Sequence, residues 1–195
     1  MVTCFPMMNS LAAGLRPLIQ ALDALHIPYV VGGSLASSIR GIVRATVDID
    51  LVVQISLTDC ARLAQELGAD WYADVPMMTE AIRMGRSFNL VWIPGGLKAD
   101  IFPAINDFHT LQLRRGTLSD IPSGAPESVT CRVATAEDIL LAKLRWYRDG
   151  GEVSDRQWSD ITGILEVNSS LDDNYLEHWA ARLGVSDLLA RARGE

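Results

Sequence analysis

The stretch from Val30 to Val53, "VVGGSLASSIRGIVRATVDIDLVV", decides the fold, because it places two glycines after one short apolar strand and two aspartates inside the next. Side chains two residues apart on a β-strand face the same side. Asp48 and Asp50 therefore share one face of a predicted strand, while the apolar residues around them pack on the other. Two carboxylates held this close repel each other unless a cation or a shared proton compensates.

A divalent cation fits this carboxylate pair. Mg²⁺ prefers oxygen ligands, keeps several waters, and takes one or two protein carboxylates together with phosphate oxygens. The later segment "KADIF" supplies a third aspartate, Asp100, on a strand that again alternates with apolar residues. The pattern predicts a metal site formed by Asp48, Asp50 and Asp100. The alternative for the first two is an ordinary solvated strand edge.

Gly32, Gly33 and Ser34 lie between a predicted strand and a predicted helix. Glycine lets the backbone come close to a ligand, and the free N–H groups at a helix start attract phosphate. Thirteen residues separate Ser34 from Asp48, enough for a short helix and a return to a neighbouring strand. We therefore expect these three residues to bind the triphosphate of a nucleotide beside the acidic pair. A plain turn is the alternative.

Composition narrows the class of protein. The 195 residues are 49% hydrophobic and 21% charged, which is typical of a globular protein with its own core. The net charge of -7 and the lack of a Lys/Arg-rich run argue against an extended surface for duplex nucleic acid. Short, interrupted apolar stretches, no basic N-terminal region and three scattered cysteines predict a cytoplasmic protein without a membrane partner.

Hydrophobic periodicity and turn residues predict the elements of the first two thirds of the chain. Helices are expected over Ser10–Leu25, Ser34–Arg40, Ser56 or Thr58 to Leu67, and Met77–Met84. Strands are expected over Pro28–Val31, Val47–Val53, Phe88–Ile93 and Leu97–Phe102, with weaker candidates at Thr110–Leu113 and Val129–Val133. The Pro-, Gly- and Ser-rich segment Ser119–Ser128 is predicted to be a loop.

Every predicted segment after Ala134 is a helix. Thr135 begins the first, and Asp155–Val167, Asp172–Leu183 and Ser186–Arg193 follow. The change from mixed strands and helices to helices alone predicts a mixed core over residues 1–134 and a helical C-terminal subdomain over residues 135–195. The expected fold class is α+β: a mixed β-sheet flanked by helices, with a C-terminal helical bundle that closes one side of a cleft.

The stretch "VGGSLASSIRGIVRATVDIDLVV" resembles the signature of nucleotidyltransferases of the DNA-polymerase-β type: hydrophobic-Gly-Ser, a spacer, then Asp-hydrophobic-Asp, with a third acidic residue on a later strand. Further segments resemble small bacterial nucleotidyltransferase-like proteins related to the toxins of abortive-infection (type IV toxin–antitoxin) systems. They include "GSLAS", "K.D.F", "ATAEDILLAKL.WY" and "SDRQW.DI.GIL", and they span nearly the whole chain. The resemblance implies a nucleotidyltransferase fold, but fold does not fix the acceptor.

By this resemblance, Asp48 and Asp50 would bind two Mg²⁺ or Mn²⁺ ions that bridge the triphosphate of an NTP. Asp100 would share one metal ion and help to deprotonate the attacking hydroxyl. The reaction would be in-line attack at the α-phosphorus, with pyrophosphate leaving. Lys143, on a helix after the core, would contact the triphosphate. Its alternative is a packing role, with the ammonium reaching toward solvent.

Other residues have weaker signals. Arg44 and Thr46 precede the acidic strand and are expected to reach phosphates or substrate, with a plain loop as the alternative. Trp146, Trp158 and Trp179 occur at helical spacing, which predicts packing in the core and not stacking on bases.

The sequence thus predicts a Mg²⁺-dependent enzyme that moves an NMP from an NTP to a hydroxyl-bearing acceptor. The acceptor class stays open among RNA, a protein side chain and a small molecule such as an aminoglycoside. A toxin-like role, with a cognate antitoxin as partner, is one version of this activity. The alternative is a non-catalytic module of a toxin–antitoxin pair that binds nucleotide or a partner protein.

Overall fold

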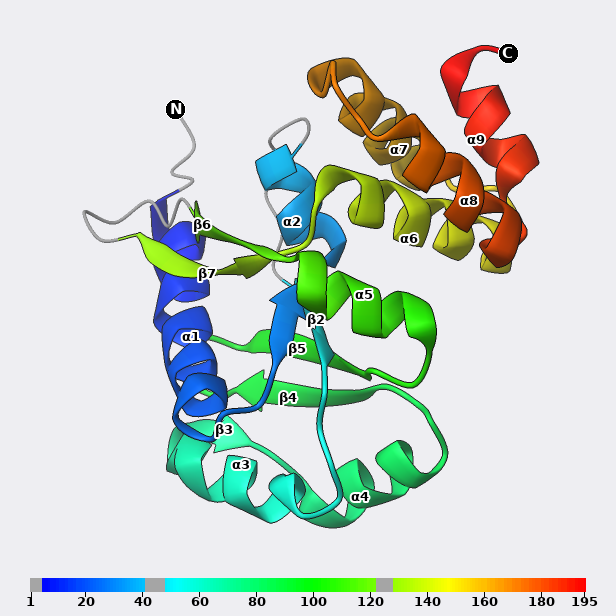
Figure 1. The fold of residues 1–195 in the computed structure, drawn as a ribbon. Coiled ribbons are helices and arrows are strands. Elements are labelled where there is room, and N and C mark those ends of the chain that lie inside the picture. The colour runs from blue at the N-terminus through cyan, green and yellow to red at the C-terminus, as the bar shows by residue number, and fades with distance from the viewer. Residues whose placement is uncertain (1–4, 41–47, 122–127) are drawn as a thin grey trace.

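The computed structural model describes residues 5–40, 48–121 and 128–195. Within them, a seven-stranded mixed sheet has the order β3-β4-β5-β2-β1-β7-β6 (Figure 1). The strands are β1 (Tyr29–Val31), β2 (Asp48–Val53), β3 (Trp71–Tyr72), β4 (Phe88–Trp92), β5 (Leu97–Pro103), β6 (Thr117–Ile121) and β7 (Val129–Val133). The pairs β2–β5 and β1–β7 are parallel, and the remaining neighbours are antiparallel.

Helices surround this sheet. They are α1 (Phe5–Ala24), α2 (Gly33–Arg40), α3 (Asp59–Leu67), α4 (Val75–Arg83), α5 (Asp107–Arg115), α6 (Ala136–Asp149), α7 (Asp155–Val167), α8 (Asp173–Leu183) and α9 (Ser186–Arg193), with a 3-10 turn, η1 (Gly68–Asp70). The helices α7, α8 and α9 gather beyond α6, away from the sheet (Figure 1). The four elements described after β7 are all helical, and the division at residue 134 into two subdomains stays a prediction. No helix of the described residues is long and apolar enough to cross a membrane.

The alternation of side chains along β5 separates the two faces of the sheet. Leu97, Ala99 and Ile101 are buried, and α1 packs on this side, so closely that a Cβ on Gly14 would lie 2.4 Å from Cδ2 of Leu97. The intervening residues of β5 point to the opposite face, where α5 contacts β1 and β2. On β5, one face is thus packed into the apolar core, and the other carries Lys98, Asp100 and Phe102.

A buried polar cluster joins α5, α6 and α8. Asp138 of α6 is fully buried and accepts a hydrogen bond from the Tyr175 hydroxyl of α8. Arg115 of α5 places Nε 3.4 Å from Oδ2 of Asp138, and its guanidinium lies 3.9 Å from the centre of the Tyr175 ring. Because each of these groups would be costly to bury alone, they fix the three helices relative to one another.

Three predictions of local structure were wrong. The segment Thr110–Leu113 belongs to helix α5, because the Asn106 side chain caps that helix by accepting from the His109 N–H at 2.8 Å. The segment Ser119–Ser128 contributes its first residues to β6, which gains its partner from antiparallel pairing with β7. Helix α1 begins at Phe5 and not at Ser10.

Candidate functional site

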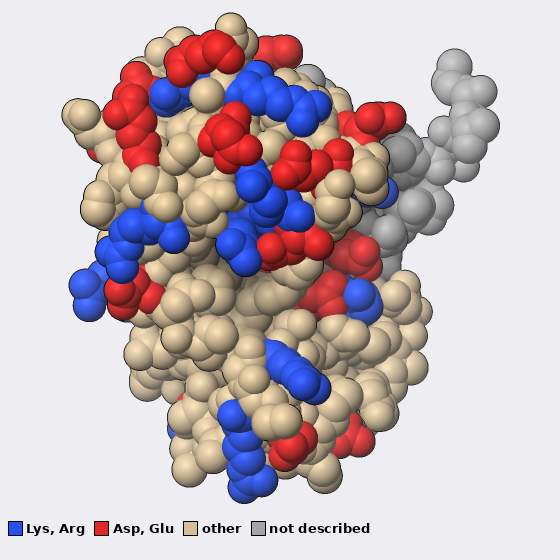
Figure 2. Space-filling view, turned by 90° about the vertical axis from the view of Figure 1, so that its right-hand side faces the viewer, with Lys and Arg blue, Asp and Glu red and all other residues tan. Residues whose placement is uncertain are grey.

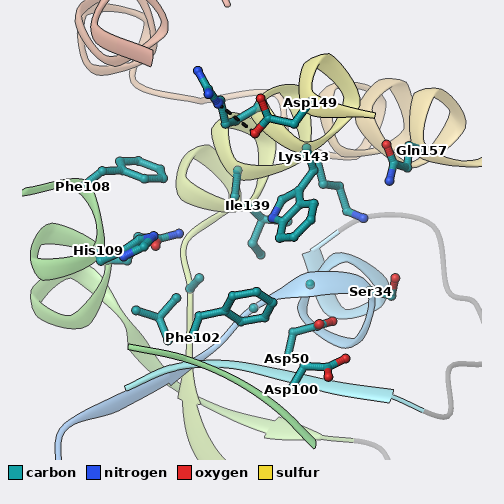
Figure 3. A pocket seen from close by; sticks show the side chains of 18 of the residues that line it. Ser34, Asp50, Asp100, Phe102, Phe108, His109, Ile139, Lys143, Asp149 and Gln157 are labelled. Carbon is teal, nitrogen blue, oxygen red and sulfur yellow. Dashed lines mark hydrogen bonds and ion pairs between the residues drawn. The ribbon is translucent and has the colours of Figure 1, made fainter. Parts of the chain in front are cut away.

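The two central strands bring the predicted aspartates together. In the parallel pairing of β2 with β5, Asp50 lies opposite Asp100 and Asp48 lies opposite Lys98. The side chains of Asp50 and Asp100 line a cavity (Figure 3), whereas Asp48 is exposed at the first position of β2. The expected position of the three aspartates on neighbouring strands is confirmed.

The turn between β1 and α2 lies directly against Asp50. The backbone N–H of Gly32 donates to the Asp50 carbonyl at 2.8 Å, and the backbone of Ser34 hydrogen-bonds to the Asp50 carboxylate. Gly33 has a φ of +57°, and a Cβ there would meet Oδ2 of Asp50 at 1.8 Å. Only glycine fits this position, because both the backbone conformation and the space exclude a side chain. The turn and the carboxylate therefore form one unit.

Burial raises the pKa of Asp50 above its usual value, and the negative charges of Asp100 and Asp48 raise it further. The hydrogen bond from Ser34 and the positive charge of Lys143 act in the opposite direction. This direction agrees with the prediction that one of the paired aspartates has a raised pKa, although burial contributes more than repulsion. A carboxylate in this environment gains free energy when a cation binds beside it.

Among the described residues, Lys98 is a cation that lies at this site. Its Nζ is 2.9 Å from Oδ2 of Asp100 on the same strand. The nearby aspartates Asp100, Asp48 and Asp50 all raise the pKa of Lys98, with the hydrogen bond to Asp100 the largest cause. The sequence motifs assign no role to this lysine. The available signal was its spacing, because residues two apart on a strand face the same side.

The carboxylates fit a divalent cation in part. Asp50 and Asp100, side by side on parallel strands, match the one or two protein carboxylates that Mg²⁺ takes when phosphate oxygens complete its shell. No three Asp, Glu, His or Cys side chains converge as a metal centre within residues 5–40, 48–121 and 128–195. The role of Asp48 as a third ligand therefore stays a prediction.

Lys143 faces the carboxylates from helix α6. It is one of few charged residues buried in the described core, with 8% of its surface exposed. Its Nζ lies 2.9 Å from Oδ2 of Asp160 on α7. In Figure 3 the side chain extends from α6 toward the end of the cavity that holds Ser34 and Asp50. The buried Lys143 ammonium, held by Asp160, therefore lies opposite the glycine turn.

The cavity has a volume of about 860 Å³ and two chemically different ends. The polar end carries the glycine turn, the carboxylates and Lys143. The other end carries aromatic side chains, with Phe102 and Trp146 in an edge-to-face contact at 5.8 Å between ring centres and Phe108 nearby. His109 also lines this end, and burial lowers its pKa. This size is in the range of cavities that hold small molecules.

Comparisons with known proteins agree with this architecture. No protein-family model and no curated protein matches the chain. The solution structure of the antibiotic-resistance factor ANT(2'')-Ia aligns over 97% of this chain and 100% of that one, with a TM-score of 0.53 and 18% identity. The crystal structure of ANT(2'')-Ia in complex with adenylyl-2''-tobramycin aligns over 89% and 96%, with a TM-score of 0.51 and 18% identity. The chain has the nucleotidyltransferase fold. At this identity the likeness establishes the fold alone.

Within the nucleotidyltransferase fold, the structure brings most of the sequence-predicted residues into one cavity. Gly32, Gly33, Ser34, Asp50, Asp100 and Lys143 all line it. Their roles in binding metal and nucleotide stay predictions. Arg44 and Thr46 lie outside the described residues.

One tryptophan prediction was wrong. Trp179 is buried at 8% exposure, and Trp158 is half-buried against the core, as the helical spacing predicted. Trp146 is 56% exposed and lines the cavity. The spacing of Trp146 along α6 matches a core position, but the neighbouring surface is the open cavity and not another helix. A periodic pattern cannot distinguish these two surroundings.

Proposed function

We propose that this protein transfers a nucleoside monophosphate from an NTP to a hydroxyl-bearing acceptor, with Mg²⁺ or Mn²⁺. One observation carries the proposal: Asp50 and Asp100 pair across β2 and β5, directly against a glycine turn that leaves no room for a side chain. Lys143 lies across the same cavity. Paired carboxylates, a phosphate-binding turn and a facing ammonium are the groups that nucleotidyl transfer requires.

Each residue has a separate task in this reaction. The glycine turn and the Ser34 hydroxyl bind the outer phosphates, and Lys143 balances their charge. The Asp100 carboxylate accepts the proton of the acceptor hydroxyl as its oxygen attacks the α-phosphorus in line. Pyrophosphate then leaves toward the turn. Asp50 and Asp100, with Asp48, would hold the divalent cation, which supplies charge neutralisation at the triphosphate.

The acceptor is proposed to be a small molecule, because the cavity has a volume of about 860 Å³ and carries aromatic side chains among its lining residues. Two further carboxylates that line the cavity are paired with basic side chains: Asp149 with Arg145 at 3.0 Å, and Asp160 with Lys143 at 2.9 Å. This pairing favours an acceptor that is not a polycation such as tobramycin. On the face shown in Figure 2, acidic and basic side chains are interspersed over the C-terminal helices, with no broad basic surface. That distribution disfavours RNA.

A second candidate function is nucleotide binding without turnover, as in a module of a toxin–antitoxin pair. The observation in its favour is the ion pair between Lys98 and Asp100, which places a cation on one of the catalytic carboxylates. A bound antitoxin partner would also belong to this alternative. Calorimetry distinguishes the two, because the module binds NTP and releases no pyrophosphate.

The test measures pyrophosphate release from ATP, GTP, CTP and UTP with Mg²⁺, in the presence of tobramycin, neutral hydroxylated small molecules, tRNA or cell extract. Asp50→Asn should abolish release, since it removes a carboxylate of the site. Asp70→Asn, at an exposed aspartate away from the cavity, should leave it unchanged. Equal release by wild type and Asp50→Asn with every NTP would overturn the enzyme proposal. A toxin role predicts growth arrest on expression of wild type but not of Asp50→Asn.

A further inference from the structure

The distribution of lysine in this chain is uneven. Of the 17 Lys and Arg residues, two are lysines, Lys98 and Lys143. Both belong to the proposed active site, and each is held by one carboxylate at 2.9 Å, Asp100 and Asp160 respectively. An ammonium on a flexible stem is a compact charge with rotatable donors, whereas a guanidinium fork is rigid. Lysine is therefore the cation better suited to changing partners.

Lys98 lies among three carboxylates. It shares a strand face with Asp100, and the register of β2 with β5 places Asp48 opposite it and Asp50 diagonally opposite. One ammonium among three carboxylates leaves two net negative charges, which one divalent cation can balance. Without Lys98 the three carboxylates would carry three net negative charges. The lysine therefore lowers the attraction of this site for a metal ion.

The Lys98 ammonium and the divalent cation also compete for one atom. Lys98 Nζ occupies Oδ2 of Asp100, and 41% of the lysine side chain is exposed against 18% of the aspartate side chain. A divalent cation that takes this oxygen must displace the ammonium, and the exposed stem of Lys98 gives it room to turn away.

We propose that Lys98 is an internal competitor of the divalent cation: it holds Asp100 in the metal-free protein and releases it when metal binds. The proposal rests on the proposed function of the site. Once released, the ammonium is available to a triphosphate bound in the cavity. Metal and NTP therefore assist each other's binding, and this coupling is reciprocal.

The test is direct titration with Mn²⁺ alone, followed by calorimetry or by the electron paramagnetic resonance of the free ion. Lys98→Gln should bind Mn²⁺ about tenfold more tightly than wild type, or better, because a charge next to the metal is removed. Its melting temperature should also rise more on addition of Mn²⁺. Lys98→Met repeats the measurement with the side-chain stem retained, in case the glutamine variant folds poorly.

The matched control is Arg62→Gln. Arg62 forms an ion pair with Asp59 at 3.1 Å, is 56% exposed and does not line the cavity. The Arg62→Gln substitution removes the same net charge from the protein as Lys98→Gln and should leave Mn²⁺ affinity at the wild-type value. The coupling is measured with a non-hydrolysable ATP analogue, which should tighten Mn²⁺ binding more in wild type than in Lys98→Gln.

The outcomes separate this proposal from the proposed function. Equal Mn²⁺ affinity in wild type and both Lys98 variants, with pyrophosphate release intact in wild type, overturns the competition and leaves the enzyme activity standing. No Mn²⁺ binding by any of the proteins overturns the competition, and the enzyme proposal is overturned with it if wild type also releases no pyrophosphate. Binding by the Lys98 variants alone is the strongest form of the expected result.

Discussion

Gly33→Ala tests the contact between the glycine turn and the carboxylate site. A Cβ at this position would lie 1.8 Å from Oδ2, 2.4 Å from Cγ and 2.6 Å from Cβ of Asp50. Rotation of the carboxylate alone cannot relieve the overlap, since the Asp50 Cβ is fixed by strand β2. Either the turn or the strand must move.

The cost of this substitution has two parts. The φ of +57° at Gly33 costs a non-glycine residue about 1–2 kcal/mol, and overpacking adds about 1–3 kcal/mol. Together they predict a loss of about 2–5 kcal/mol, or a fall in melting temperature of roughly 4–20 °C for a protein of this size. Thermal unfolding, followed by circular dichroism in metal-free buffer, measures it.

Gly32→Ala is the matched control. A Cβ on Gly32 would have no heavy atom within 4 Å, so its melting temperature should stay close to that of wild type. Gly33→Ala could instead have the same melting temperature as Gly32→Ala and bind nucleotide as tightly as wild type. In that case the turn does not constrain Asp50, and the phosphate site is not preformed.

Three further predictions follow from charged groups. Asp50 has a raised pKa because of burial and the charge of Asp100, so the folded protein binds this proton more tightly than the unfolded chain, and wild type loses stability as pH rises through that pKa. Asp50→Asn should therefore equal or exceed wild type in metal-free urea denaturation at pH 7, with an advantage that shrinks on acidification. Tyr175→Phe removes the hydroxyl that donates to buried Asp138 and should lower the free energy of unfolding by about 1–3 kcal/mol. Lys143→Met should weaken ATP binding roughly 10- to 100-fold in calorimetry, because a charge-assisted contact is lost.

Each of these predictions has an outcome that would contradict it. The Asp50 prediction is wrong if Asp50→Asn keeps the wild-type dependence of stability on pH. Tyr72→Phe, whose ring is 53% exposed, should unfold like wild type; an equal loss in both tyrosine variants would argue against the buried cluster. Arg62→Gln should retain ATP affinity, and a similar affinity in the Lys143 variant would exclude that lysine from the triphosphate site.

The sequence by itself determined which side chains share a face. Period-two geometry places Asp48 with Asp50, and Lys98 with Asp100, whatever the strands pair with. It also indicated the glycine turn and the beginning of α6 at Thr135, whose side chain accepts from the Asp138 N–H. These features are local, since they depend on backbone geometry and on neighbours within one turn or strand.

Only the tertiary structure decided that β2 and β5 are parallel neighbours in the register that sets Asp50 against Asp100. The same pairing places Lys98 opposite Asp48 and creates the competition for metal. The packing of α6 over the sheet likewise left Trp146 at a cavity instead of in the core. Strand register and burial depend on contacts between residues far apart in the chain, and the periodicity within a single segment carries no information about them.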